Sequence, residues 1–176
     1  MNIESILNGA TSFGNSFIPF LLTALSVLTG LYLLFSAIAS IYKKSSDVRD
    51  QESSYAAIAM RLLIGGMLLR FGSTVEDVSL LITGVPIEDY RGVLAYAPLP
   101  EGAGLWRQVM EVVLLWVVML GWAGAYRGLL LWAKATNGGG AGGNGGDLFW
   151  QGIWHLIGGA LAVNLSGAIS SFVGGS

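Results

Sequence analysis

The C-terminal stretch LFWQGIWHLIGGALAVNLSGAISSFVGGS, residues 148–176, decides the fold class because none of its 29 residues carries a formal charge. A membrane-spanning helix needs about 20 apolar residues to cross roughly 30 Å of hydrocarbon. The stretch is long enough for this. It therefore predicts a membrane helix, which we place at residues 148–173.

Small residues recur at every fourth position of this predicted helix and form one ridge along it: Gly158, Ala162, Ser166, Ser170 and Gly174. Helices in lipid gain no hydrophobic energy by pairing, so close backbone approach across small residues is a main source of attraction. We therefore expect the ridge to be a packing and oligomerisation face. The alternative is that glycine and alanine are simply frequent in membrane helices.

The composition places the whole chain in a membrane. Hydrophobic residues make up 53% of the sequence and charged residues 11%, with a mean hydropathy of +0.65, whereas soluble proteins carry about 25% charged residues. The net charge of -2 argues against a nucleic-acid-binding domain, which usually has a basic stripe. The chain has no cysteine and one histidine, which excludes disulfides, thiolate catalysis, and cysteine or histidine-rich metal sites.

Uncharged runs predict an all-α integral membrane protein with about four transmembrane helices in a single helical domain, residues 1–176. The helices are expected at residues 17–42, 55–71, 106–134 and 148–173. On the first helix, Ser26 and Gly30 repeat the four-residue spacing and add a second packing face. Residues 84–104 are rich in proline and glycine and predict a loop, either an apolar patch for a partner or a loop folded back on the helix ends. The glycine-rich residues 136–146 predict a flexible tether.

Positive residues near helix ends indicate the orientation. Lys43, Lys44 and Arg49 place the first connection in the cytoplasm. The loop 84–104 then lies outside, the tether 136–146 returns to the cytoplasm, and both termini face outward.

No sequence motif indicates catalysis, because the nucleotide-binding GxxxxGK[ST], zinc-binding HExxH and hydrolase GxSxG patterns are all missing. We therefore expect a protein that is not an enzyme and has no cofactor. His155 and Asn164 lie nine residues apart, on opposite sides of the predicted helix. His155 is expected to be interfacial, and Asn164 to contact another helix because an unpaired amide in the membrane is costly.

Arginines in and beside the predicted spans suggest a phosphate ligand, since the guanidinium fork matches phosphate geometry. We expect at least one of Arg61, Arg70 and Arg127 to bind a phospholipid head group, which the lipid content of purified Arg→Ala variants tests. The alternative is that these side chains only reach toward the membrane surface. A channel or transporter is a further alternative, with Arg61, Arg70, Glu111 and Arg127 along its path.

Residues 154–164, WHLIGGALAVN, resemble the C-terminal membrane helix of the IcmC/DotE family, small polytopic proteins of type IVB secretion systems whose relatives on conjugative plasmids are called TraQ. The chain length and the glycine-bearing loop before the last helix are similar too. The resemblance implies a non-enzymatic inner-membrane or pilus component of an apparatus that moves DNA or protein between cells. No catalytic residue is implied.

By analogy with pilins of other conjugative systems, Lys43, Lys44 and Arg49 would line a filament lumen. The resulting expectation is a structural subunit of a conjugative or type IVB secretion apparatus, homo-oligomeric and in its filament form holding phospholipid. An accessory membrane protein that holds other secretion components through its acidic outer loop is a third alternative.

Overall fold

The computed structural model describes residues 3–46, 55–87, 89–95, 104–137 and 145–173, and its regular elements in these ranges are all helical. In chain order they are α1 (Ile3–Ser46), α2 (Tyr55–Leu69), α3 (Phe71–Thr83), the 3₁₀ helix η1 (Tyr90–Ala95), α4 (Gly104–Asn137), α5 (Gly145–Val163) and α6 (Leu165–Val173). The prediction of an all-α chain is confirmed for the described residues.

Helix α1 is much longer than the predicted first span, 17–42. It begins at Ile3 and contains Pro19 in its interior, although proline removes one helical hydrogen bond. The predicted start of the first helix at residue 17 is therefore too late, because residues 3–16 are helical as well. Gly14 is buried against the side chains of Leu115 and Met119 on α4, so a contact distant in sequence holds this part of the helix.

Helices α2 and α3 meet at Arg70 with a bend of 96°. The backbone stays hydrogen-bonded through the bend, since the Arg70 amide donates to the Gly66 carbonyl (3.2 Å) and the Thr74 amide donates to the Arg70 carbonyl (2.9 Å). Helix α3 ends at Gly84, whose φ of 71° is the left-handed cap conformation that glycine adopts without strain. The helix predicted at 55–71 therefore corresponds to α2, which is 15 residues long and ends at the bend.

The predicted fourth helix, 148–173, is not continuous, which corrects the sequence-based assignment. It is two helices, α5 and α6, separated at Asn164. Neither proline nor a positive φ marks the break. Instead, the Asn164 side chain is hydrogen-bonded to residues from a distant part of the chain. Helix α5 also starts earlier than expected, at Gly145, and α4 runs on to Asn137, so only 138–144 of the predicted tether 136–146 lies outside the described residues.

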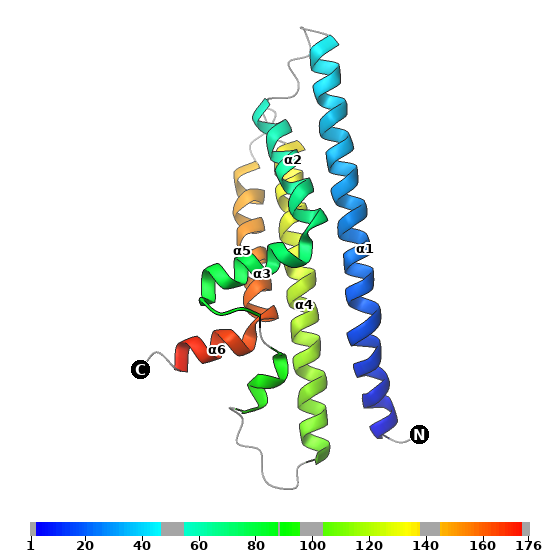
Figure 1. Ribbon diagram of the computed structural model, residues 1–176, viewed down its shortest axis with the longest axis vertical. Coiled ribbons are helices and arrows are strands. Elements are labelled where there is room, and N and C mark those ends of the chain that lie inside the picture. Colours follow the sequence, from blue (N-terminus) through cyan, green and yellow to red (C-terminus); the bar gives the residue numbers. More distant parts are fainter. Residues whose placement is uncertain (1–2, 47–54, 88, 96–103, 138–144, 174–176) are drawn as a thin grey trace.

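The order of helix lengths repeats along the chain. A long helix is followed by a shorter helix that runs back beside it and then by a short helix that turns aside, first as α1, α2 and α3 and then as α4, α5 and α6 (Figure 1). The two long helices run in the same direction, and α3 and α6 both leave the long axis on the side away from α1 (Figure 1). Helix η1 contacts α4 and α6.

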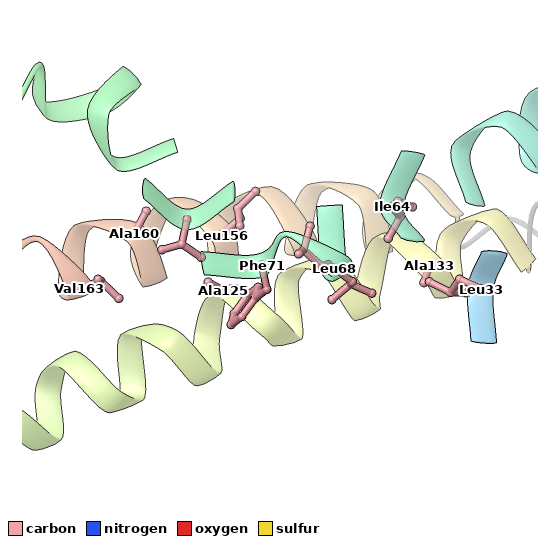
Figure 2. Close-up of a cluster of buried hydrophobic side chains, with 11 residues drawn as sticks. Leu33, Ile64, Leu68, Phe71, Ala125, Ala133, Leu156, Ala160 and Val163 are labelled. Atoms are coloured by element: carbon pink, nitrogen blue, oxygen red, sulfur yellow. The ribbon is translucent and has the colours of Figure 1, made fainter. Parts of the chain in front are cut away.

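The buried core lies where the two sets of helices meet. Figure 2 shows Leu33 of α1, Ile64 and Leu68 of α2 and Phe71 of α3 facing Ala125 and Ala133 of α4 and Leu156, Ala160 and Val163 of α5. The rings of Trp122 and Tyr126 meet Phe71 edge-on, with centroids 5.6 and 5.9 Å away. Small residues on α4 and α5 let larger side chains of α1 to α3 fill this space.

Two helices in the described chain are long and apolar enough to cross a membrane: residues 5–45 of α1 and 104–136 of α4. The bent pair α2 and α3 would make a third span if it acts as one. The chain thus has two to three such helices, and the predicted count of four is not fixed. Only 17% and 22% of the most apolar windows of α1 and α4 are buried, so most of their apolar surface faces outward.

Candidate functional site: the groove between α4 and α5

Helices α4 and α5 are antiparallel and approach at glycines spaced seven residues apart on each helix: Gly121 and Gly128 on α4, Gly152 and Gly159 on α5. A Cβ added to Gly159 would come within 2.5 Å of the Gly121 carbonyl oxygen, and one added to Gly128 within 2.7 Å of the Gly152 carbonyl oxygen. The two backbones therefore touch where side chains are missing, the contact that drives helix pairing in lipid.

This close approach leaves an open groove of about 440 Å³ along one side of the helix pair. Its walls are almost entirely apolar and come from both helices: Val117, Leu120, Gly121 and Gly124 of α4, and Trp154, His155, Gly158, Gly159 and Ala162 of α5. Gly158 is exposed, with open space beside its Cα. The floor of the groove is therefore glycine backbone, and larger apolar side chains stand at its edges.

The predicted small-residue ridge coincides with the groove only in part. Gly158 and Ala162 line the groove. Ser166 lies beyond the break in α6 and is buried, with its side chain near Gly92. The side chain of Ser170 and Gly174 lie outside the described residues. The prediction of one continuous small-residue face over all five positions is therefore wrong, because the helix axis changes direction at Asn164.

The second predicted face, Ser26 and Gly30, lies inside the chain. Both residues are buried in α1, and a Cβ on Gly30 would come within 2.9 Å of the Gly65 carbonyl oxygen of α2. The Ser26 hydroxyl donates to the Thr23 carbonyl oxygen (2.9 Å). Gly30 therefore serves the packing of α1 on α2 within one molecule.

Asn164 is fully buried and joins three segments. Its side-chain oxygen accepts a hydrogen bond from the Gly167 amide (3.2 Å), which makes it the N-cap of α6. Its side-chain nitrogen lies 3.1 Å from the Val85 carbonyl oxygen, 3.3 Å from that of Pro86 and 3.3 Å from the Thr83 hydroxyl. The expectation that Asn164 contacts another helix is confirmed: it ties α5 and α6 to the end of α3.

His155 lines the groove, but its Nδ1 lies 2.8 Å from the Gln151 carbonyl oxygen one turn earlier in the same helix. The half-buried ring is thus positioned by its own backbone. The loop residues show a similar inward packing: Leu94 of η1 is buried and Val93 is half-buried. This agrees with a loop folded back on the helices for the described part of 84–104.

The arginines lie at separate places. Arg61 Nη1 donates to the Ser40 hydroxyl of α1 (3.2 Å), and its buried Nε has no hydrogen-bond partner among the described residues. Arg70 at the bend and Arg127 on α4 are exposed. Glu111 pairs with Arg107 one turn away at 3.7 Å, as expected for i,i+4 neighbours. Phosphate binding by these arginines stays a prediction.

The basic residues Lys43 and Lys44 occupy the last turn of α1. The Lys44 ammonium lies 3.8 Å from the centre of the Tyr55 ring at the start of α2, a cation–π contact that joins the two helix ends. Arg49 lies outside the described residues. The proposed lumen-lining role of this loop stays a prediction.

Sequence reasoning missed the glycines that bring α4 and α5 together. The matching seven-residue spacing of Gly121 and Gly128 and of Gly152 and Gly159 is the signal that could have found them. Trp132 adds a further contact, since its Nε1 donates to the Phe149 carbonyl oxygen (3.0 Å) and its ring stacks on that of Phe149.

No protein-family model, curated protein or solved structure matches the chain.

Proposed function

We propose that this protein is a non-catalytic helical membrane subunit that assembles with further copies of itself. The apparatus we propose for it is of the conjugative or type IVB secretion class, on the resemblance of residues 154–164 to the IcmC/DotE family. The inner membrane of a bacterium is the corresponding location, and a filament with bound phospholipid is one form the assembly would take.

The observation that carries this proposal is the open groove between α4 and α5. An apolar groove with a glycine floor suits a helix. In lipid, hydrophobic burial does not drive helices together, and dispersion contacts with the exposed glycine backbone favour close packing instead. The proposal also draws on α1, whose outward side carries large apolar residues: Phe20, Leu28, Tyr32 and Phe35 are 65–71% exposed.

Filling the groove tests the proposal. Gly158→Leu places a large side chain in open space, since nothing lies within 4 Å of the added Cβ, so the fold is expected to survive while close helix approach is blocked. The matched control is Gly66→Leu on α2, which is also exposed with nothing within 4 Å.

Oligomer size in mild detergent, measured by native mass spectrometry, and particles seen by negative-stain microscopy are the readouts. We expect oligomers for the unaltered chain and the Gly66→Leu control, and a several-fold loss for Gly158→Leu. Monomers alone for the unaltered chain would refute self-assembly, and unchanged oligomers with Gly158→Leu would show that the groove has no part in it.

A further inference from the structure

The two sets of helices match in register as well as in order. Gly30 of α1 and Gly121 of α4 are each in contact with a glycine of the shorter helix that follows. Gly65 and Gly159 each lie five residues before the break residue, Arg70 or Asn164. Gly30 meets Gly65, and Gly121 meets Gly159. The glycine contact between long and shorter helix therefore recurs at equivalent positions.

The sequence carries a trace of the same repeat. LIGGML at residues 63–68 of α2 recurs as LIGGAL at residues 156–161 of α5, but this alignment is shifted by one residue from the register of the glycine contacts, so the register rests on those contacts. Lys43 lies 13 residues after Gly30, and Lys134 lies 13 residues after Gly121. The described helices thus form two similar sets, a first unit of α1, α2 and α3 and a second unit of α4, α5 and α6.

In the first unit, one side of the α1–α2 pair is covered by α4. The Thr29 and Tyr126 hydroxyls are hydrogen-bonded at 2.8 Å. Beside this bond, Leu33, Ile64 and Leu68 of the first unit share one buried cluster with three residues of α4: Ala125, Leu129 and Ala133. The long helix of the second unit therefore seals this side of the first unit.

The equivalent side of the second unit is the open groove. The positions that correspond to Thr29, Leu33, Ile64 and Leu68 are Leu120, Gly124, Gly158 and Ala162, and all four line the groove. The groove is thus the continuation of the interface between the first unit and α4. Among the described residues, no further long helix covers the groove.

We propose that α1 of a second copy supplies it. Helix α1 is the first-unit counterpart of α4, and the positions that match those facing inward on α4 are exposed on α1. The residues of α4 are Met119, Trp122, Tyr126, Leu129 and Ala133, and their counterparts on α1 are Leu28, Leu31, Phe35, Ile38 and Tyr42, 39–76% exposed. All five are large and apolar or aromatic.

The side chains on the two proposed partners are complementary in size and polarity. Where the first unit offers Leu33, Ile64 and Leu68, the groove offers Gly124, Gly158 and Ala162, which leaves room for larger side chains. At the position of Ala133 the second copy brings Tyr42. The hydrogen-bonded pair Thr29 and Tyr126 corresponds to Leu120 and Phe35, so both polar partners are replaced by apolar ones together.

This contact is heterologous, because the groove of one copy receives α1 of the next. The groove of the second copy and α1 of the first copy stay free, so the same contact adds further copies until the array closes as a ring or continues as a filament. The inference rests on the proposed function, since it names the partner and the geometry of that self-assembly.

Pairwise crosslinking tests it, and the absence of cysteine from the chain makes introduced cysteines the only thiols. Chains with Leu120→Cys are co-expressed with chains carrying Phe35→Cys, and membranes are treated with a short bismaleimide. The matched control replaces Phe35→Cys with Leu25→Cys: Leu25 is 42% exposed on α1, and its counterpart Trp116 is 43% exposed on α4 rather than packed on the first unit.

We expect dimers from Leu120→Cys with Phe35→Cys at a several-fold excess over the Leu25→Cys control. The double variant should give a ladder of dimers, trimers and larger species, which Gly158→Leu should abolish. Dimers from Phe35→Cys chains alone, without the Leu120 pair, would overturn the groove contact while leaving self-assembly intact. Absence of dimers from the Leu120→Cys and Phe35→Cys pair would overturn the groove contact. If an amine-reactive crosslinker then yields only monomers from the unaltered chain, the proposed function fails as well.

Discussion

At the scale of single residues, Asn164 has the role that proline or glycine commonly has at helix breaks. It ends α5 by capping α6, and its amide nitrogen faces oxygens of Thr83, Val85 and Pro86. A buried carbonyl group without a donor is costly, by about 1–3 kcal/mol. One fully buried amide side chain thus satisfies groups from two parts of the chain that are distant in sequence.

Asn164→Ala should lower the free energy of unfolding by about 2–4 kcal/mol, from the lost cap and the unpaired carbonyl oxygens. Thermal unfolding in detergent, followed by circular dichroism, measures it against Asn8→Ala, since Asn8 is exposed on α1. Asn164→Asp keeps the capping oxygen but sets a carboxylate against these oxygens, so it should destabilise at least as much. A near-neutral Asn164→Asp would show that only the cap matters.

At the scale of elements, adjacent glycines have opposite roles. Gly159 is packed against the backbone of α4, where an added Cβ would lie 2.5 Å from the Ala125 nitrogen and from the Gly121 carbonyl oxygen, whereas Gly158 faces open space. One helical residue turns the side-chain direction by about 100°, which is enough to separate the helix contact from the groove. The pair α1 and α2 uses Gly30 and Gly65 in the same way.

Gly159→Ala should therefore push α4 and α5 apart and destabilise the fold by about 1–3 kcal/mol. Gly158→Ala should be neutral or stabilising by up to about 1 kcal/mol, because alanine favours helix over glycine. Unfolding midpoints of the two variants check this. Equal effects of both substitutions would contradict the α4–α5 contact.

At the scale of the whole molecule, α1 and α4 set the long dimension. At 44 and 34 residues they extend about 66 and 51 Å at 1.5 Å per residue, beyond the roughly 30 Å of a hydrocarbon layer. They run in the same direction (Figure 1). Their C-terminal ends, which carry Lys43, Lys44 and Lys134, therefore lie at one end of the molecule, and their N-terminal ends lie at the other.

Single cysteines can test this arrangement in a membrane. Thiols at Ser45 and Lys134 should react with a membrane-impermeant maleimide from one side, and thiols at Asn8 and Gln108 from the other, since all four positions are exposed near helix ends. The basic ends predict that Ser45 and Lys134 face the cytoplasm. Intact cells and inverted vesicles provide the two sides, and labelling of all four from the same side would refute the two spans.

The sequence by itself indicated that the protein belongs in a lipid environment and that its secondary structure is helical. A charged fraction of 11% and long uncharged runs favour hydrocarbon whatever the chain's shape, because transfer energies add residue by residue. They also favour helices, since each helix satisfies its own backbone. The positions of α2 and α4 followed from these runs to within a few residues. The small-residue spacing singled out Gly158 and Ala162, which line the groove, and their role in oligomerisation stays a prediction.

Only the tertiary structure decided where helices end and which glycines touch. The break at Asn164 and the packing of the first part of α1 involve partners far away in sequence, namely Val85 for Asn164 and Met119 for Gly14. The choice between Gly158 and Gly159 depends on the rotation of α5 against α4. Such contacts are properties of pairs of helices, so no local pattern contains them, and the repeat of two units emerged only once those pairs were seen together.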